Sequence, residues 1–342
     1  MREALRSGPV LLAAVIGLHC SYPSLPPTEA PEFAEVRPPA GFPPIPVPPD
    51  NPLTPERIAL GRLLFYDSAL SPTGTVACAS CHRQQYAFAD SRSLSPGTHG
   101  RKHWRNTPSL ANAVYVPTLL RDGASNSLEQ EILAVLTSPL GFGWTDTTAL
   151  SNRLQRHPSY REAFRRAFGT APSAMLAAKA LAAFVRALLS GSSPYDRFRA
   201  GDSSALSPQQ HQGMQLFFRV GCAECHPPPL FTDHRFHCNG LLAHYWDAGR
   251  AGVTGRPADY ARFRTPSLRN VAVTAPYLHD GSLGTLHEVL QRYNRGGYPV
   301  ASKDPRIRPL GLSAEEVEAL AAFLHSLTDS SLLHNPLYGP PR

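Results

Sequence analysis

The chain of 342 residues has only six cysteines and three methionines, and it has little strand-like patterning. Four of the cysteines lie in two short motifs, which leaves Cys20 and Cys238 and excludes a disulfide framework. The longest apolar run, near the N-terminus, spans about ten residues and is too short for a membrane-spanning helix. Segments that alternate apolar and polar residues are scarce, whereas helical periodicity is common. These absences favour an all-α fold.

Charge of either sign is also sparse, because Lys, Arg, Asp and Glu make up 17% of the chain. The formal net charge of +7 suits an acidic partner surface or plain solubility. The basic residues are scattered and form no nucleic-acid-binding motif, so no nucleic-acid partner is expected. With 42% hydrophobic residues the chain can bury large cores, which excludes a disordered protein.

Two pentapeptides share the pattern Cys-x-x-Cys-His: "CASCH" at residues 78–82 and "CAECH" at residues 222–226. This is the attachment pattern of a c-type haem, in which two thiols on one side of a turn form thioethers to the porphyrin and the adjacent His binds iron. Zinc would need a closed set of four ligands, which three-residue clusters supply poorly. A thioredoxin-like pair would need a βαβ setting, and neither copy has one. The sequence therefore predicts two covalently bound haems, held by Cys78, Cys81 and His82 and by Cys222, Cys225 and His226.

The N-terminal residues have the pattern of an export signal. Residues 1–20 combine two arginines with the apolar run "GPVLLAAVIGLHC", so we expect a signal peptide and a periplasmic protein. Cys20 ends this run as the lipidated Cys of a lipoprotein would, although His19 stands where a small residue is expected. The alternatives are a membrane-anchored lipoprotein and a stray Cys20 that is lost on cleavage. Residues 21–51 are rich in proline and predict an extended tether followed by an arm lying on the folded body, and residues 331–342 predict a loose tail.

The two haem motifs belong to a longer internal duplication. "LTPERIALGRLLFYD" and "LSPQQHQGMQLFFRVG" precede the motifs, and both open with an N-cap signature. After the motifs, "RNTPSLANAVYVPTLLRDGASNSLEQEI" matches "FRTPSLRNVAVTAPYLHDGSLGTLHEVL" in order. The sequence therefore predicts two homologous c-type cytochrome domains with long loops, at residues 52–190 and 195–330, each holding one haem.

These features together resemble the bacterial di-haem cytochrome c peroxidase and MauG family. The resemblance rests on the paired motifs, "RNTPSL", "LRDG" and "TPSLRNVAVTAPYLHDGSLGTLHEVLQRYNRGG", and covers roughly residues 41–330. It implies a periplasmic oxidoreductase in which hydrogen peroxide reacts at the first haem and the second haem passes electrons or stores an oxidising equivalent. It also implies a donor: a small cytochrome c, a cupredoxin, or an oxidisable residue of a partner protein.

The resemblance also implies a second iron ligand at the second haem, either a Met or a Tyr. The methionines are Met1, Met175 and Met214, and none follows "APYLHDG", where that ligand belongs. Tyr293 in "QRYNRGG" lies at the tyrosine position of MauG-like members, so we expect a His/Tyr haem. The alternative is that Tyr293 is an aromatic residue packed under a helix.

The first haem should have an open position for peroxide. The peroxidase branch has a His in the loop before "RN", and the aligned residue here is Thr98. His99 and His103 lie next to it, and a slip of one residue would let His99 bind the iron. We expect a five-coordinate first iron; His99 ligation and a solvated loop are the alternatives.

Two residues depart from the family pattern. The Trp expected between the haems is Arg121, and the distal Glu expected to move a proton between the peroxide oxygens is Gly141. Glycine cannot transfer a proton. Glu131 or Glu129 could substitute, although both also suit the solvated first turn of a helix. Trp144 is a weaker candidate for the missing relay. These departures keep open a di-haem electron-transfer protein or redox sensor without efficient peroxidase activity.

The resemblance finally implies a calcium ion between the domains, bound by the Asn106 side chain and the carbonyls of Thr274 and Pro276. The alternative is that Asn106 caps a turn. Cys238 has no evident partner, and we expect it to be a small buried residue.

Overall fold

The computed structural model describes residue 33 and residues 35–341. The predicted signal peptide, Cys20 and the first part of the proline-rich segment lie outside the described residues. The helices are α1 (Pro55–Tyr66), α2 (Leu128–Thr137), α3 (Thr147–Arg156), α4 (Pro158–Phe168), α5 (Ala174–Ala187), α6 (Pro194–Arg199), α7 (Pro208–Arg219), α8 (Ala251–Thr254), α9 (Leu286–Asn294), α10 (Ala314–His325) and α11 (Ser330–His334).

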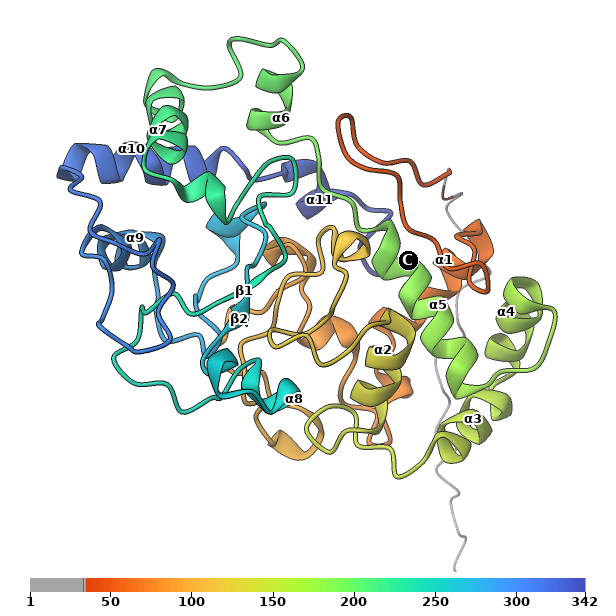
Figure 1. The fold of residues 1–342 in the computed structure, drawn as a ribbon. Coiled ribbons are helices and arrows are strands. Elements are labelled where there is room, and N and C mark those ends of the chain that lie inside the picture. Colours follow the sequence, from red (N-terminus) through yellow and green to blue (C-terminus); the bar gives the residue numbers. More distant parts are fainter. Residues whose placement is uncertain (1–32, 34, 342) are drawn as a thin grey trace, which may run out of the picture.

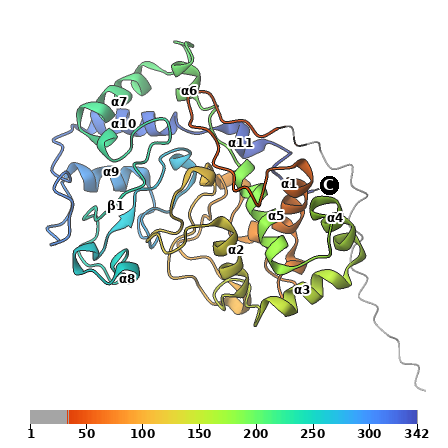
Figure 2. The same cartoon turned by 45° about the vertical axis from the view of Figure 1, so that its right-hand side comes forward.

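The fold is mainly helical, as predicted, with long loops between the helices (Figure 1). The described strands are β1 (Phe236–His237) and β2 (Phe263–Arg264), which pair antiparallel. Within the described part of the chain, no helix is long and apolar enough to cross a membrane. In both ribbon views α1 to α5 lie on one side of the molecule and α7, α9 and α10 on the other (Figures 1 and 2).

Each half is built on one crossing of two helices. Helix α1 packs on α5, and helix α7 packs on α10. A glycine lies at each crossing: a Cβ on Gly61 would be 1.9 Å from the carbonyl oxygen of Ala180, and one on Gly213 would be 1.8 Å from that of Ala319. Both crossings therefore need a residue without a side chain, which explains the shared Gly in the two helices.

A triangle of phenylalanines fills the space beside each crossing. In the first half the rings of Phe65, Phe88 and Phe184 have centroids 5.2–6.4 Å apart. In the second half Phe217, Phe231 and Phe323 form the same triangle, with centroids 5.2–6.2 Å apart. All six rings are fully buried, and they meet at interplanar angles of 59–83°, so both cores use the same tilted to edge-on aromatic packing.

The predicted N-cap signatures are confirmed. The Thr54 hydroxyl accepts a hydrogen bond from the amide of Arg57 at the start of α1, and the Ser207 hydroxyl accepts one from Gln210 at the start of α7. These bonds satisfy amides that have no partner inside the helix, so the Leu-Thr/Ser-Pro sequences fix where both helices begin.

The proline-rich arm contacts both halves of the molecule. Tyr115 donates a hydrogen bond to the carbonyl of Pro43 at 3.1 Å. The ring of Phe42 lies 4.6 Å from the guanidinium of Arg269, a residue of the second repeat. At the inner end of the arm, Asn51 is fully buried. The described part of this segment therefore packs along the folded body.

The C-terminal tail is not a loose end, and this expectation was wrong. The buried guanidinium of Arg62 in α1 donates to the carbonyls of Gly339, Pro336 and Pro340 at 2.7–3.1 Å. The Tyr66 hydroxyl donates to the carbonyl of Tyr338. Helix α11 covers the start of the tail, and the residues after it, which are rich in proline and glycine, leave their carbonyls free to bind a side chain. The tail thereby ties the end of the chain to the first half.

Candidate functional site

The two Cys-x-x-Cys-His motifs fold in the same way. Cys78 begins one 3-10 turn and Cys222 begins the other. The amides of His82 and His226 each donate to the carbonyl of the first Cys of their motif, at 2.9 Å in both cases. The thiols of the motifs are free rather than paired in disulfides. They are thus available for thioether attachment.

The two imidazoles are oriented by equivalent backbone carbonyls. Nδ1 of His82 lies 2.8 Å from the carbonyl oxygen of Phe88, and Nδ1 of His226 lies 3.0 Å from that of Phe231. A carbonyl only accepts, so Nδ1 carries the proton and Nε2 keeps its lone pair for a metal. Burial lowers the pKa of both imidazoles, which keeps them neutral. The arrangement fits an axial ligand of haem iron in each half.

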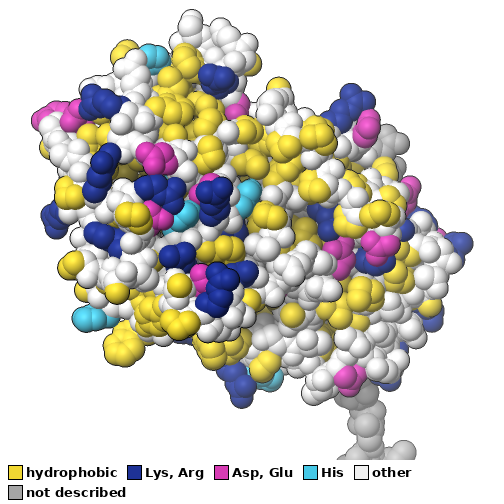
Figure 3. All heavy atoms as spheres, viewed as in Figure 1, with side chains coloured by type: hydrophobic (Ala, Val, Ile, Leu, Met, Phe, Trp, Pro, Cys, Tyr) yellow, Lys and Arg dark blue, Asp and Glu magenta, His cyan; other side chains and the backbone are white. Residues whose placement is uncertain are grey.

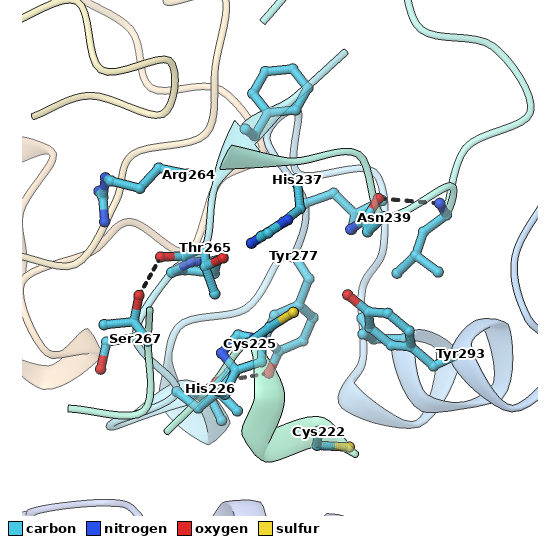
Figure 4. Close-up of a pocket in the computed structure, with 18 of the residues that line it drawn as sticks. Cys222, Cys225, His226, His237, Asn239, Arg264, Thr265, Ser267, Tyr277 and Tyr293 are labelled. Atoms are coloured by element: carbon cyan, nitrogen blue, oxygen red, sulfur yellow. Dashed lines mark hydrogen bonds between the residues drawn. The ribbon is translucent and has the colours of Figure 1, made fainter. Parts of the chain in front are cut away.

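A cavity of about 340 Å³ opens above the second motif. Cys222, Cys225, His226 and Tyr293 all line it. Figure 4 shows Tyr293 projecting from α9 toward the space above Cys225 and His226. Apolar side chains from α7, α9 and α10 complete the wall, as a porphyrin requires. The cavity fits a haem held between His226 and Tyr293.

The phenol of Tyr293 needs a nearby positive centre before it can ionise. Burial raises the pKa of Tyr293 to about 12. A ferric iron supplies the charge that stabilises a bound phenolate. Tyr293 as an iron ligand stays a prediction, and its place in the cavity is consistent with it.

Polar side chains that the sequence analysis did not single out also line this cavity. The guanidinium of Arg264 donates to the carbonyl of Leu120 at 3.3 Å, while its terminal nitrogens make no hydrogen bond to described residues. His237 lies between two carboxylates, 2.9 Å from Asp233 and 2.8 Å from Asp304. Arg264 would hold a haem propionate by charge pairing. Its position just before "TPSL" was the available signal.

Helix α2 of the first repeat corresponds in sequence to helix α9 of the second repeat. The sequence match that pairs Ser127 with Thr285 also pairs α2 with α9, and both residues cap their helix. The cavity-lining residues of α9 are Leu286, Val289, Leu290 and Tyr293. Their counterparts in α2 are Leu128, Glu131, Ile132 and Val135. The first half therefore has Val135 where the second half has a tyrosine, and Glu131 where it has a valine.

The two candidate carboxylates of α2 have different environments. Glu129 is buried and binds the guanidinium of Arg186 at 2.6 Å and the amide of Asn51 at 2.7 Å. These partners lower the pKa of Glu129 to about 2, although burial opposes the shift. Glu131 is half-buried, and burial raises its pKa. Glu129 is therefore a structural ion-pair residue, whereas Glu131 has the raised pKa that suits an acid–base group.

The surroundings of Gly141 and Trp144 explain why neither residue takes part in the chemistry proposed from the sequence. A Cβ on Gly141 would lie 2.2 Å from the carbonyl oxygen of Val135, so no side chain fits there. Trp144 is buried in the core of the first half, and its indole N–H donates to the carbonyl of Leu70 at 2.8 Å. Its environment is that of a core residue, which gives no support to a relay role.

The loop that could supply a sixth ligand to the first iron has three candidates. His99 is exposed and has a left-handed backbone with φ of 64°. His103 is half-buried, and burial lowers its pKa. The Thr98 hydroxyl is buried without a hydrogen-bond partner among the described residues. Five-coordination of the first iron stays a prediction, and it is consistent with the exposure of His99.

The residues predicted to bind calcium do not fit that ion. Asn106, Thr274 and Pro276 line one cavity, as the prediction requires. However, Oδ1 of Asn106 accepts a hydrogen bond from the guanidinium of Arg121 at 2.8 Å. A side-chain oxygen that already faces one cation is a poor ligand for a second. The Asn106 side chain does not cap a turn either, since its Nδ2 donates to the carbonyls of Arg92 and Ser93. Cys238 is buried, as predicted.

Comparison with known proteins gives consistent matches. Residues 55–204 match the family model described as di-haem cytochrome c peroxidase. The chain is 37% identical to the cytochrome-c peroxidase IdrP1 of Pseudomonas sp. over 338 residues, which covers 88% of this chain and 89% of that protein. It is 38% identical to the methylamine utilization protein MauG of Methylorubrum extorquens over 288 residues, covering 83% and 81%. A crystal structure of a MauG-like protein associated with microbial copper homeostasis superposes with a TM-score of 0.85, at 36% identity, covering 89% of this chain and 98% of that one.

Proposed function

This chain belongs to the di-haem cytochrome c peroxidase and MauG family of oxidoreductases, and we propose that it reduces hydrogen peroxide at the haem of His82 with electrons that pass through the haem of His226. The family supports two c-type haems as its cofactors. When bound, the haem irons supply the redox chemistry. The predicted calcium ion has no part in this proposal.

The observation that carries the proposal is the difference between α2 and α9. Tyr293 of α9 lines the second cavity and would close the far side of that iron. Its counterpart Val135 has no donor atom, so the position equivalent to Tyr293 supplies no ligand to the first iron. An open site for peroxide and a closed site for electron transfer follow from one substitution between the repeats.

We assign the proton transfer at the first site to Glu131. Reduction of peroxide to water needs a base that takes a proton from one oxygen and delivers it to the other. Glu131 takes the repeat position of the cavity-lining Val289, and burial raises its pKa. Its carboxylate would accept the proton as peroxide binds and donate it as the O–O bond breaks.

The electron donor is proposed from the same family and from the surface. A small cytochrome c, a cupredoxin or an oxidisable residue of a partner protein would fill this role. On the face in Figure 3, more Lys and Arg side chains lie over the half with α7, α9 and α10, with Asp and Glu among them. The net charge of +7 suits an acidic partner. The proposed location is the periplasm, with a lipid anchor on Cys20 as a further possibility to test by mass.

Two measurements on the diferric holoprotein test the proposal. Low-temperature EPR should show one high-spin ferric haem and one low-spin haem, and Tyr293→Phe should change only the low-spin signal. Mixing with hydrogen peroxide should then change the Soret band within milliseconds to seconds. Two low-spin haems, or a Soret band that stays constant over seconds, would instead support the second candidate, an electron-transfer protein or redox sensor. The absence of any side chain at Gly141 is the observation that favours that candidate.

A further inference from the structure

The two repeats meet through a pair of equivalent backbone hydrogen bonds. The amide of Asn106 donates to the carbonyl of His279, and the amide of Arg264 donates to the carbonyl of Arg121, both at 2.7 Å. The sequence match pairs Asn106 with Arg264 and Arg121 with His279, so the two bonds are related by the internal symmetry. These four residues form the joint between the repeats, and all four line the cavity above the second motif.

The side chains at this joint do not follow the symmetry. The guanidinium of Arg121 donates through Nη2 to Oδ1 of Asn106 at 2.8 Å and through Nε to the carbonyl oxygen of the same residue at 3.2 Å. Nδ2 of Asn106 is directed at the carbonyls of Arg92 and Ser93, which fixes the amide so that its oxygen faces the guanidinium. Asn106 is buried, so this contact is shielded from water.

We propose that the guanidinium of Arg121 takes the place of a divalent cation at the joint between the two repeats, so that this chain forms the joint without calcium. A planar cation with several donors can hold a side-chain oxygen and a carbonyl oxygen of one residue, as a hard ion would. Arg121 is therefore a positioning residue: its guanidinium fixes Asn106 within the first repeat. The backbone amide of Asn106 in turn donates to the carbonyl of His279 in the second repeat.

The charges around the joint support the replacement of calcium by the guanidinium of Arg121. Burial lowers the pKa of Arg121, and the nearby guanidiniums of Arg264 and Arg105 lower it further, to about 10. Arg121 thus stays protonated at neutral pH. Asp280 is the facing acid, while Asp122 and Asp247 are bound by Arg105. A divalent cation added beside three guanidiniums would be repelled.

The test uses the holoprotein with both haems attached. Metal analysis after gel filtration should find well under one calcium per chain, and a calcium chelator should change neither the haem spectrum nor the thermal midpoint. Arg121→Ala should lower the midpoint by a few degrees, and millimolar calcium should restore part of that loss. Arg121→Lys keeps the positive charge, so its thermal midpoint should fall less than that of Arg121→Ala and should not respond to calcium. Arg161→Ala, on the exposed face of α4, is the matched control and should behave as the wild type.

Two results would overturn the proposal. One is wild-type protein that retains one calcium per chain and loses thermal stability on chelation. The other is an Arg121→Ala protein that matches the wild type in its midpoint or shows no response to calcium. Neither readout depends on peroxidase activity, so the proposal can fail while the proposed function stands.

Discussion

Helices α2 and α9 hold equivalent places in the two repeats, yet they carry different side chains at equivalent positions. Both are capped by a hydroxyl residue, Ser127 or Thr285, and both pack on the last helix of their half. Val289 and Tyr293 of α9 line the cavity, however, and the aligned residues of α2 are Glu131 and Val135. The cores around them, with one glycine crossing and one aromatic triangle each, are nearly the same.

This contrast separates the parts of the repeat that build the scaffold from those that assign its role. The Cys-x-x-Cys-His motif, the Nδ1 hydrogen bond and the aromatic core are the same in both repeats, as two equivalent haem attachments require. The far side of each iron decides whether a small oxidant can reach it. In the proposed function, the different tasks of the two domains come from two positions of one helix, those of Glu131 and Val135.

Removing the carboxylate of Glu131 in α2 should have the largest effect on function. We expect Glu131→Gln to lower the second-order rate constant for hydrogen peroxide by about 10²–10⁴-fold, the usual contribution of an acid–base group. Because the resting group must be deprotonated, the wild-type rate should fall as pH drops through the raised pKa of Glu131, and the variant should lose this limb. Stopped-flow mixing across pH 4–8 measures both.

The control for this experiment is Glu162→Gln, which removes an exposed carboxylate paired with Arg165 on α4. It should leave the rate constant and the pH profile unchanged. A wild-type rate in Glu131→Gln would show that α2 supplies no proton and would remove the functional contrast between the helices.

The next largest effect concerns stability and the ion pairs that hold α2 and α9. Glu129 forms a buried ion pair with Arg186, whereas its counterpart His287 forms an exposed pair with Glu318. We expect Glu129→Gln to lower the free energy of unfolding by about 3–5 kcal/mol, because it leaves the buried charge of Arg186 unpaired. His287→Ala should cost about 1 kcal/mol or less, since exposed pairs contribute little. Urea unfolding of both holoproteins at pH 7 measures this.

The pH dependence of the same pair has a definite sign. The folded pKa of Glu129 is about 2, below the ordinary value of 4.5, so the pair stabilises the fold above pH 4.5. That stability is lost as pH falls from 4.5 toward 2. The difference between wild type and Glu129→Gln should therefore narrow over this range, and a constant difference would show that the ion pair is not its source.

The smallest effect tests whether the two cores are truly equivalent. We expect Gly61→Ala and Gly213→Ala each to lower the free energy of unfolding by about 1–3 kcal/mol, because the new Cβ meets a backbone carbonyl at the helix crossing. Gly252→Ala in α8 has open space around its Cβ and should be neutral or slightly stabilising. A large difference between the two crossings would contradict the packing symmetry.

Much of the site could be predicted because its residues are close in sequence. The Cys-x-x-Cys-His motifs fix the thiols and the imidazole within one turn, and the duplication fixes α2 against α9. The position of Tyr293 in the second cavity agrees with the prediction from the family pattern. The tail was misjudged because its contact is with Arg62, 277 residues away from Gly339 in the chain. No local pattern reports a contact of that separation.

The sequence by itself determined the two haem-attachment motifs, the helical repeats and the family, because each depends on local spacing or on matches along the chain. Only the tertiary structure decided that Glu129 is held in an ion pair while Glu131 is not, and that Arg121 binds the oxygen of Asn106. Those outcomes depend on burial and on partners from distant segments. Two carboxylates two residues apart look alike in a sequence, and only their surroundings give them different pKa values.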